Sequence, residues 1–209
     1  MLEKFSTVSV SIGPESFQLT SFKDVYSEFS QHYDEGDGFE EPPLYGILWP
    51  SAEGLAWSLW QNHREALKGV RVLEIGCGLA LPSLLAARLG ADVLAMDNHT
   101  NFPKVLSENM AANNVLCQAS VGSFADPKLN LGEFDWIIGS DILYEPDLYP
   151  ELERFIVRHA KPNARVIIAD PGRYAASKFG ASLKGNSRYT KVIQKIPSGQ
   201  EIDLYTFDF

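Results

Sequence analysis

The sequence predicts an α/β fold with a doubly wound, mostly parallel sheet, and three observations support this prediction. From Val70 onward, apolar runs of strand length alternate with stretches of helical periodicity, an order typical of parallel strands joined by helices. The first of these strands ends in Gly76-Cys77-Gly78, where the backbone must turn sharply. The last two apolar segments flank a Pro-Ser-Gly-Gln turn at residues 197–200, which predicts that the final strand enters the sheet antiparallel.

The chain before this sheet predicts a small β extension. Residues 8–12 and 16–22 alternate apolar and polar side chains around Gly13-Pro14-Glu15, a pattern typical of a β-hairpin that serves as a cover. A polar connection over residues 31–41 follows and ends in Pro42-Pro43, and movement of this connection could gate a site. We therefore expect an N-terminal hairpin with its connecting segment over 1–43 and a main domain over 44–209.

The elements of the main domain follow from apolar periodicity. Helical spacing begins after Pro50, with Ser51 as the candidate cap. In chain order we expect a helix over 51–67, a strand from 70 to the glycine turn, a helix, a strand over 91–97, a helix, a short strand over 115–120, a strand containing Ile137 and Ile138, a helix over 148–160, and strands over 165–169, 189–196 and 202–207.

Length and composition limit the possible classes of protein. The chain has 209 residues, 45% hydrophobic and 11% aromatic, enough to bury one substantial core. The formal net charge of −9 disfavours strong nonspecific binding to nucleic-acid phosphates and is compatible with a basic partner such as a lysine-rich protein surface. Simple solubility explains the same charge.

Cysteine and histidine usage points to no disulfide framework and no metal site. Cys77 and Cys117 are the two cysteines, and neither they nor the four histidines have metal-ligand spacing. Residues 1–10 lack a basic region followed by an apolar core, and no run of eighteen apolar residues occurs. These features predict a cytoplasmic protein that does not span a membrane.

The segment from Val72 to Pro82, together with Asp97, predicts a nucleotide-cofactor site. An apolar strand stops at two glycines spaced one apart, and the following helix directs its N-terminal N–H groups at a ligand. The next apolar strand ends in Asp97, whose carboxylate can accept hydrogen bonds from both ribose hydroxyls. A dinucleotide fingerprint requires glycine where Leu81 stands, which argues against NAD or FAD. Glu74 adds a carboxylate suited to a cationic ammonium or its ordered water.

This E-x-G-x-G pattern resembles the first motif of class I S-adenosylmethionine-dependent methyltransferases, with Ala80 where that family usually has a third glycine. Two further segments resemble the seven-β-strand branch that contains protein lysine methyltransferases. They are Gly46-Ile47-Leu48-Trp49-Pro50-Ser51-Ala52 and the D-x-x-Y signature Asp141-Ile142-Leu143-Tyr144. The resemblance covers residues 44–168 and implies a Rossmann-like sheet of seven strands with an antiparallel C-terminal hairpin.

The resemblance also implies roles for the matched positions. Trp49 is expected to flank the cofactor, Asp97 to take its ribose, and Asp141 and Tyr144 to edge the substrate mouth. The amino-acid part of the cofactor is expected against Glu74, Gly76, Cys77 and Gly78.

Asp141 and Tyr144 are the candidate catalytic residues. They follow a buried strand at the sheet edge where ligands sit in open α/β folds. Asp141 could orient an amine and accept its proton, and Tyr144 could offer a cation–π face to the ammonium or sulfonium. The alternatives are a helix N-cap for Asp141 and a packing aromatic for Tyr144.

Further cofactor contacts are expected from residues after neighbouring strands. Ser123 and Phe124 follow the third strand, where such folds hold adenine, although the related enzymes often carry a tryptophan near Phe124. Asn98 follows the ribose acid, and Ser140 precedes Asp141. Arg173, in an Asp-Pro-Gly-Arg turn, could pin an acidic group of a substrate or pair with a carboxylate.

The sequence thus predicts an S-adenosylmethionine-dependent methyltransferase that acts on a nitrogen acceptor, with a protein lysine side chain as the leading candidate. A small-molecule amine or heterocyclic nitrogen is the alternative acceptor. A methyltransferase-fold binding module without turnover is the alternative function, and Glu74, Asp97, Asp141 and Tyr144 argue against it.

Overall fold

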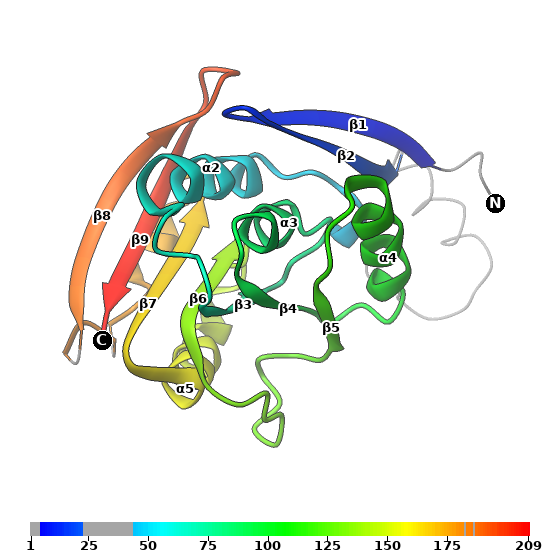
Figure 1. Cartoon of the computed structure of the whole chain (residues 1–209). Helices are drawn as coiled ribbons and strands as arrows, with labels where there is room; N and C mark the ends of the chain where they lie inside the picture. The colour runs from blue at the N-terminus through cyan, green and yellow to red at the C-terminus, as the bar shows by residue number, and fades with distance from the viewer. Residues whose placement is uncertain (1–4, 23–43, 182, 186) are drawn as a thin grey trace, which may run out of the picture.

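The computed structural model describes residues 5–22, 44–181, 183–185 and 187–209. A mixed sheet of seven strands runs through the molecule in the order β5-β4-β3-β6-β7-β9-β8 (Figure 1). Neighbouring strands from β5 to β7 are parallel, whereas β9 is antiparallel to both β7 and β8. The predicted parallel sheet with an antiparallel C-terminal hairpin is therefore confirmed. The strands are β3 (Arg71–Ile75), β4 (Asp92–Asp97), β5 (Gln118–Val121), β6 (Phe134–Ser140), β7 (Ala160–Asp170), β8 (Arg188–Lys195) and β9 (Glu201–Asp208).

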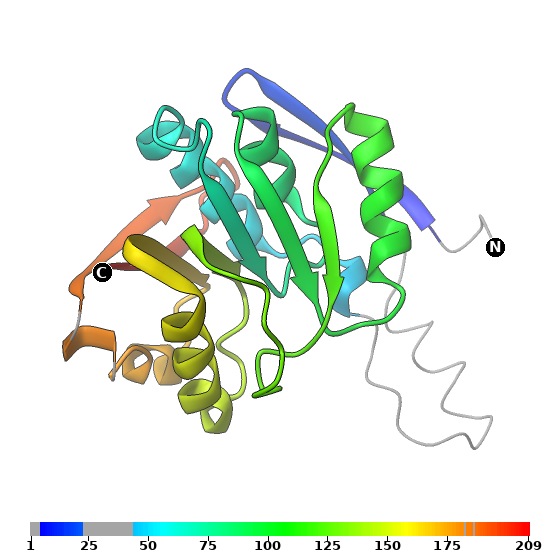
Figure 2. The ribbon, with the colours of Figure 1, turned by 60° about the horizontal axis from the view of Figure 1, so that its bottom comes forward.

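Helices cover both faces of the sheet, as the doubly wound prediction requires (Figure 2). Side chains of α2, α3 and α4 share one apolar cluster with Val72, whereas α5 packs with the adjacent Leu73 on the other face. This alternation follows from the two-residue period of a strand. The helices are α2 (Pro50–Ser58), α3 (Leu81–Arg88), α4 (Phe102–Asn113) and α5 (Tyr149–His159), with short turns η2 (Leu44–Gly46), η3 (Leu59–His63), η4 (Pro146–Leu148), η5 (Tyr174–Lys178) and η6 (Leu183–Gly185).

The first helix differs from the sequence prediction at both ends. Trp49 is its N-cap and Pro50 its first residue, because proline suits a position whose N–H would be unpaired anyway. The prediction that Ser51 caps the helix is wrong: Ser51 is fully buried, and its Oγ finds no partner among the described residues. The α-helix ends at Ser58 and continues as the π-helical turn η3 rather than to residue 67.

The predicted N-terminal hairpin is confirmed as β1 (Phe5–Ile12) and β2 (Glu15–Phe22), which pair antiparallel. Gly13 has φ +59°, the left-handed conformation that a two-residue hairpin turn requires at this position. The hairpin lies across the helical layer formed by α2, α3 and α4 (Figure 1). The predicted polar connection at 31–43 falls outside the described residues.

None of the helices in the described part of the chain has both the length and the apolar character needed to cross a bilayer.

Candidate functional site

A cavity of about 300 Å³ opens at the carboxyl ends of β3, β4 and β6. This is the edge of an open α/β sheet where ligands bind. Every site residue predicted from the sequence lines the cavity except Glu74. The predicted residues in the wall are Trp49, Gly76, Cys77, Gly78, Asp97, Asn98, Ser123, Phe124, Ser140, Asp141 and Tyr144.

The glycine turn needs its glycines for two separate reasons. Gly76 and Gly78 have φ values of +62° and +51°, a region that side chains disfavour. A Cβ on Gly76 would come within 2.6 Å of Ile142 Cγ2, and one on Gly78 within 3.3 Å of the Tyr45 carbonyl oxygen. Ala80, where the resembling family has its third glycine, also has a positive φ of +62°. The backbone thus keeps the glycine-type conformation even where the residue is alanine.

Asp97 ends β4 at the cavity and organises the surrounding backbone. Its Oδ2 accepts a hydrogen bond from Gly78 N at 3.0 Å, and its Oδ1 accepts one from His99 N at 3.1 Å. Burial raises the pKa of Asp97, and these backbone donors oppose that shift. Each carboxylate oxygen has a second lone pair, so Asp97 retains acceptor capacity toward a ligand in the cavity.

Glu74 lies behind the cavity rather than in its wall. One carboxyl oxygen accepts hydrogen bonds from Ser83 N at 2.9 Å and from the Ser83 hydroxyl, which ties β3 to the start of α3. Burial raises the pKa of Glu74 to about 8. Its other oxygen, Oε1, is buried and has no hydrogen-bond partner among the described residues. The predicted contact of Glu74 with the cofactor stays a prediction; in the structure Glu74 is bonded to Ser83 and is not among the residues that line the cavity.

Two wall residues that the sequence analysis did not select are Tyr45 and His99. Their rings stack with centroids 4.0 Å apart, and both line the cavity beside Asp97. Burial, followed by the charge of Asp97, raises the pKa of Tyr45. Tyr45 lies in η2, just before the Trp-Pro segment. Its closeness in sequence to Trp49 is the one feature from which its place in the cavity wall could have been predicted.

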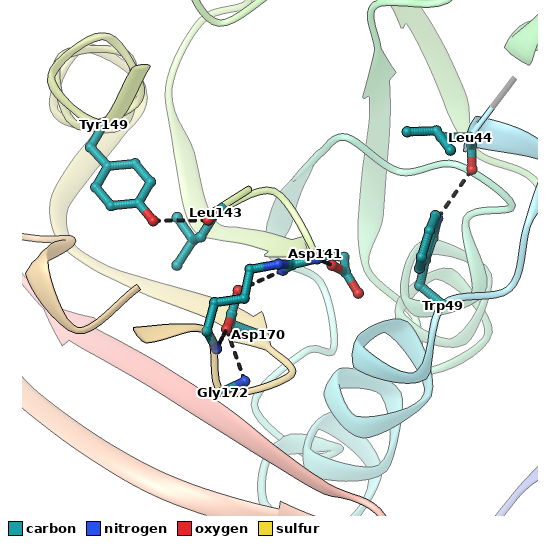
Figure 3. Close-up of polar contacts among 8 residues, drawn as sticks. Leu44, Trp49, Asp141, Leu143, Tyr149, Asp170 and Gly172 are labelled. Atoms are coloured by element: carbon teal, nitrogen blue, oxygen red, sulfur yellow. Dashed lines mark hydrogen bonds and ion pairs between the residues drawn. The ribbon is translucent and has the colours of Figure 1, made fainter. Parts of the chain in front are cut away.

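A hydrogen bond from the indole N–H fixes the Trp49 side chain at the cavity. Its Nε1 donates a hydrogen bond to the Leu44 carbonyl at 3.1 Å, which joins the start of α2 to η2 (Figure 3).

Asp141 stands at the end of β6 in an unusual backbone conformation. Its φ is +60°, and its N–H donates to the Ala169 carbonyl at 2.9 Å. The side chain is ion-paired with Nη2 of Arg173, which lies in the turn after β7. The cap of the nearest helix, η4, is Glu145, so Asp141 is not a helix N-cap.

Arg173 bridges two carboxylates at the cavity. Its Nη1 lies 2.8 Å from Oδ2 of Asp170, which is fully buried and also accepts hydrogen bonds from Gly172 N and Arg173 N. The sequence left open whether Arg173 binds an acidic group of a substrate or pairs with a carboxylate of the protein. In the structure it pairs with carboxylates of the protein. The result is a clamp between the ends of β6 and β7.

The D-x-x-Y loop is held from the opposite side by α5. The Tyr149 hydroxyl donates to the Leu143 carbonyl at 2.8 Å (Figure 3). Tyr144 is 53% exposed and lines the cavity, so it is not a core-packing aromatic. The loop thus places a buried carboxylate and an exposed phenol at the same opening.

The arrangement fits an adenosyl cofactor on two observations. Gly76 and Gly78 line the cavity without a side chain of their own, and Asp97 has acceptor capacity remaining for ribose hydroxyls. Trp49, Asn98, Ser123 and Phe124 surround the rest of the cavity with aromatic and polar groups.

Comparison with known proteins gives one family match. The family described as lysine methyltransferase matches residues 43–186. "Histone-arginine methyltransferase METTL23" of Xenopus laevis is 36% identical over 116 residues, which cover 52% of this chain and 49% of that protein. "EEF1A lysine methyltransferase 3" of Xenopus tropicalis is 27% identical over 169 residues, which cover 73% of this chain and 72% of that protein. The chain thus spans about half the length of the METTL23 relative.

Among solved structures, the 16S rRNA N2 G1207 methyltransferase of T. Thermophilus, in complex with AdoMet and guanosine, superposes with a TM-score of 0.66 at 16% identity. The alignment covers 98% of this chain and 50% of that protein. A putative SAM-dependent methyltransferase from Streptococcus mutans gives a TM-score of 0.67 at 15% identity, covering 97% and 55% of the two chains. These likenesses show the shared fold.

Proposed function

We propose that this chain, which belongs to the lysine methyltransferase family, transfers a methyl group from S-adenosylmethionine to a nitrogen atom of a protein side chain. The observation that carries the proposal is Asp97 at the end of β4, bonded to the glycine turn at Gly78 and exposed to the cavity. A carboxylate in this position serves the ribose of an adenosyl cofactor.

In this proposal, different residues of the cavity wall bind different parts of the cofactor. Asp97 accepts hydrogen bonds from the ribose hydroxyls, while Ser123, Phe124 and Asn98 hold the adenine. Gly76, Cys77 and Gly78 line the amino-acid part, and Trp49 flanks it. When bound, the sulfonium supplies an electrophilic methyl group.

On the acceptor side, Asp141 and Tyr144 act at the mouth of the cavity. Methyl transfer is an in-line displacement by a neutral nitrogen, so the protein chiefly aligns the two centres and keeps water out. Asp141 orients the acceptor nitrogen and accepts its proton, directly or through water. Tyr144 offers an aromatic face to the cationic group. Arg173 and Tyr149 are positioning residues, because they hold Asp141 and the Leu143 carbonyl.

Lysine is the leading acceptor, and arginine is the second candidate. The family description and two groups of relatives, EEF1A lysine methyltransferase 3 and Protein N-lysine methyltransferase METTL21A, support lysine. The relatives with 31–40% identity carry the name histone-arginine methyltransferase, which supports arginine. A cytoplasmic location is part of the proposal, since Cys77 and Cys117 are both free thiols, as expected in a reducing compartment.

The test is methyl labelling followed by identification of the modified residue. The protein is incubated with isotopically labelled S-adenosylmethionine and, separately, with core histones or elongation factor 1A, the protein classes that the relatives' names specify. Mass spectrometry of the digested acceptor then distinguishes methyllysine, methylarginine and methylhistidine. We expect label on lysine.

Label on arginine would replace lysine with the second candidate. Cofactor binding with no transfer to protein, but with transfer to small amines, would support a small-molecule enzyme. Cofactor binding without transfer to any acceptor would leave a binding module.

A further inference from the structure

The N-terminal hairpin reaches the cofactor cavity through a chain of contacts at one end. β2 ends at Phe22, beside η2, although the two segments are separated in sequence by residues outside the described part. The Ser21 hydroxyl donates a buried hydrogen bond to the Gly46 carbonyl at 2.9 Å. The end of the hairpin is therefore bonded directly to the turn that carries Tyr45.

Phe22 packs so closely on this turn that only glycine fits beneath it. A Cβ on Gly46 would lie 1.7 Å from Cδ2 of the Phe22 ring. The same ring stacks on Phe5 with centroids 4.7 Å apart and meets Tyr45 edge to face at 5.7 Å. Phe22 is thus the aromatic link between the hairpin and the cavity wall.

Tyr45 carries the contact onward into the cavity. Its ring stacks on His99, and its carbonyl oxygen is the backbone atom nearest to a Cβ built on Gly78. His99 N and Gly78 N are the two backbone donors to Asp97. A displacement of η2 would therefore disturb both neighbours of the ribose acid.

The position of the hairpin is set independently by α4. Asn109 Oδ1 accepts a hydrogen bond from Thr20 N at 2.7 Å, and Asn113 bonds both the N–H and the carbonyl of Gln18. These side-chain amides bond to backbone groups on one edge of β2, as the backbone of a neighbouring strand would. Because they hold β2 at Gln18 and Thr20, close to its end, they also help to fix where Phe22 meets Gly46.

We propose that the Ser21–Phe22 end of the hairpin is a positioning element of the cofactor site, so that docking of this end and binding of the adenosyl cofactor stabilise one another. The inference rests on the proposed function, because it takes the cavity as an S-adenosylmethionine site. Coupling of this kind is reciprocal: whatever strengthens one event strengthens the other by the same factor.

The test compares two truncations in the same hairpin. Phe22→Ala removes the contact with Gly46 and Tyr45, whereas Val10→Ala removes buried apolar surface where β1 pairs with Phe17, near the opposite end. Titration calorimetry with S-adenosylhomocysteine gives Kd for each variant, and urea unfolding gives its stability. We expect Phe22→Ala to weaken binding by about tenfold or more, and Val10→Ala to keep the parent Kd despite its lower stability.

A second variant and a second measurement guard against misfolding of Phe22→Ala. Gly46→Ala keeps the phenylalanine but forces its ring away, and we expect a similar loss of affinity. In the parent protein, S-adenosylhomocysteine is expected to slow amide hydrogen exchange over residues 17–22, and this protection should disappear in Phe22→Ala.

Two outcomes would overturn the inference alone: a parent Kd in Phe22→Ala, or equal losses of affinity in Phe22→Ala and Val10→Ala. If the parent protein itself fails to bind the ligand, the proposed function is overturned, and the inference falls with it.

Discussion

Asp141 shows how one residue can combine backbone strain with a charged partner. A left-handed conformation costs most non-glycine residues about 1–2 kcal/mol, and aspartate less because its short polar side chain can form local hydrogen bonds. Asp141 is held in this conformation with φ +60°. The ion pair with Arg173 and the N–H bond to Ala169 keep it in place. Such strain is found where a site requires a defined side-chain direction.

Replacing Asp141 with asparagine tests its role without changing its shape. Asparagine tolerates the left-handed conformation, and its Oδ1 can still accept a hydrogen bond from Arg173, so the loop should keep its geometry. We expect turnover with the labelled acceptor to fall by about 10²-fold or more, the scale of lost general-base catalysis, while the Kd of S-adenosylhomocysteine stays at the parent value. Steady-state kinetics and calorimetry measure the two quantities, and undiminished turnover would remove Asp141 from the catalytic role.

Glu74 should make the stability of the protein depend on pH. Its pKa rises from an ordinary value of 4.5 to about 8 in the folded protein. The folded state therefore binds this proton more tightly than the unfolded state. The resulting stabilisation is fully present below about pH 4.5 and is lost as pH rises through about 8, a change on the order of 5 kcal/mol.

Glu74→Gln removes this titration but keeps a group that can bond to Ser83. We expect the free energy of unfolding of the variant to fall less steeply between pH 5 and pH 8 than that of the parent, as measured by urea unfolding across that range. Glu65→Gln changes an exposed carboxylate, 93% accessible, and is the matched control for charge. Parallel curves for the parent and Glu74→Gln would contradict the expected burial effect.

At the scale of single residues, the sequence predicted those site residues that a short local motif identifies. The glycine turn, Asp97 and the D-x-x-Y loop could be recognised because each lies at the end of one strand. The pair of Asp141 and Arg173 spans 32 positions and depends on β6 and β7 being neighbours. The placement of Glu74 behind the wall depends on which face of β3 meets Ser83, which spacing alone did not specify.

At the scale of elements, the N-terminal hairpin is held by α4 and by Arg88 at the end of α3. The Arg88 guanidinium lies over the Phe17 ring at 4.1 Å and donates to the Ser16 carbonyl at 3.0 Å. Phe17 and Leu19 are fully buried in the cluster that includes residues of α2, α3 and α4. The hairpin thus shares its core with the main sheet layer. The division into 1–43 and 44–209 remains our proposal.

Asn113→Ala tests the docking of this hairpin. The change leaves the N–H and the carbonyl of Gln18 without their side-chain partner. Because Gln18 is only half-buried, we expect a loss of about 0.5–1.5 kcal/mol, the net contribution of a typical hydrogen bond, in urea unfolding. Glu108→Ala, on the exposed side of the same helix, is the control. Equal stabilities of Asn113→Ala and the parent would mean that the amide does not hold the strand.

Elements with strong periodicity were predicted well, and contacts between distant elements were not. The alternation of β3 to β7 and the C-terminal hairpin followed from apolar pattern and turn residues. The bond of Asn113 to Gln18 joins positions 95 residues apart, which no local pattern reveals. The start of α2 was misplaced because Ser51 resembled a cap, whereas Pro50 already begins the helix.

At the scale of the molecule, the strand order explains why the site lies where it does. β3 lies between β4 and β6, so the glycine turn, Asp97 and Asp141 meet at one edge of the sheet. In the proposed function, β3 and β4 supply the cofactor side of the cavity, and the ends of β6 and β7 supply the acceptor side. A single opening can therefore hold both reactants in line, which is the main requirement of methyl transfer.

The most direct test of this account is titration calorimetry with S-adenosylmethionine, S-adenosylhomocysteine and NAD on the parent protein and on Asp97→Ala. We expect saturable binding of both adenosyl ligands by the parent, no binding of NAD, and a loss of about 10²-fold or more in the variant, since charge-assisted hydrogen bonds contribute about 1.5–3 kcal/mol each. Thermal unfolding of the variant checks that it is folded. Failure of the parent to bind either adenosyl ligand, or equal affinity in Asp97→Ala, would contradict the assignment of the cavity as the cofactor site.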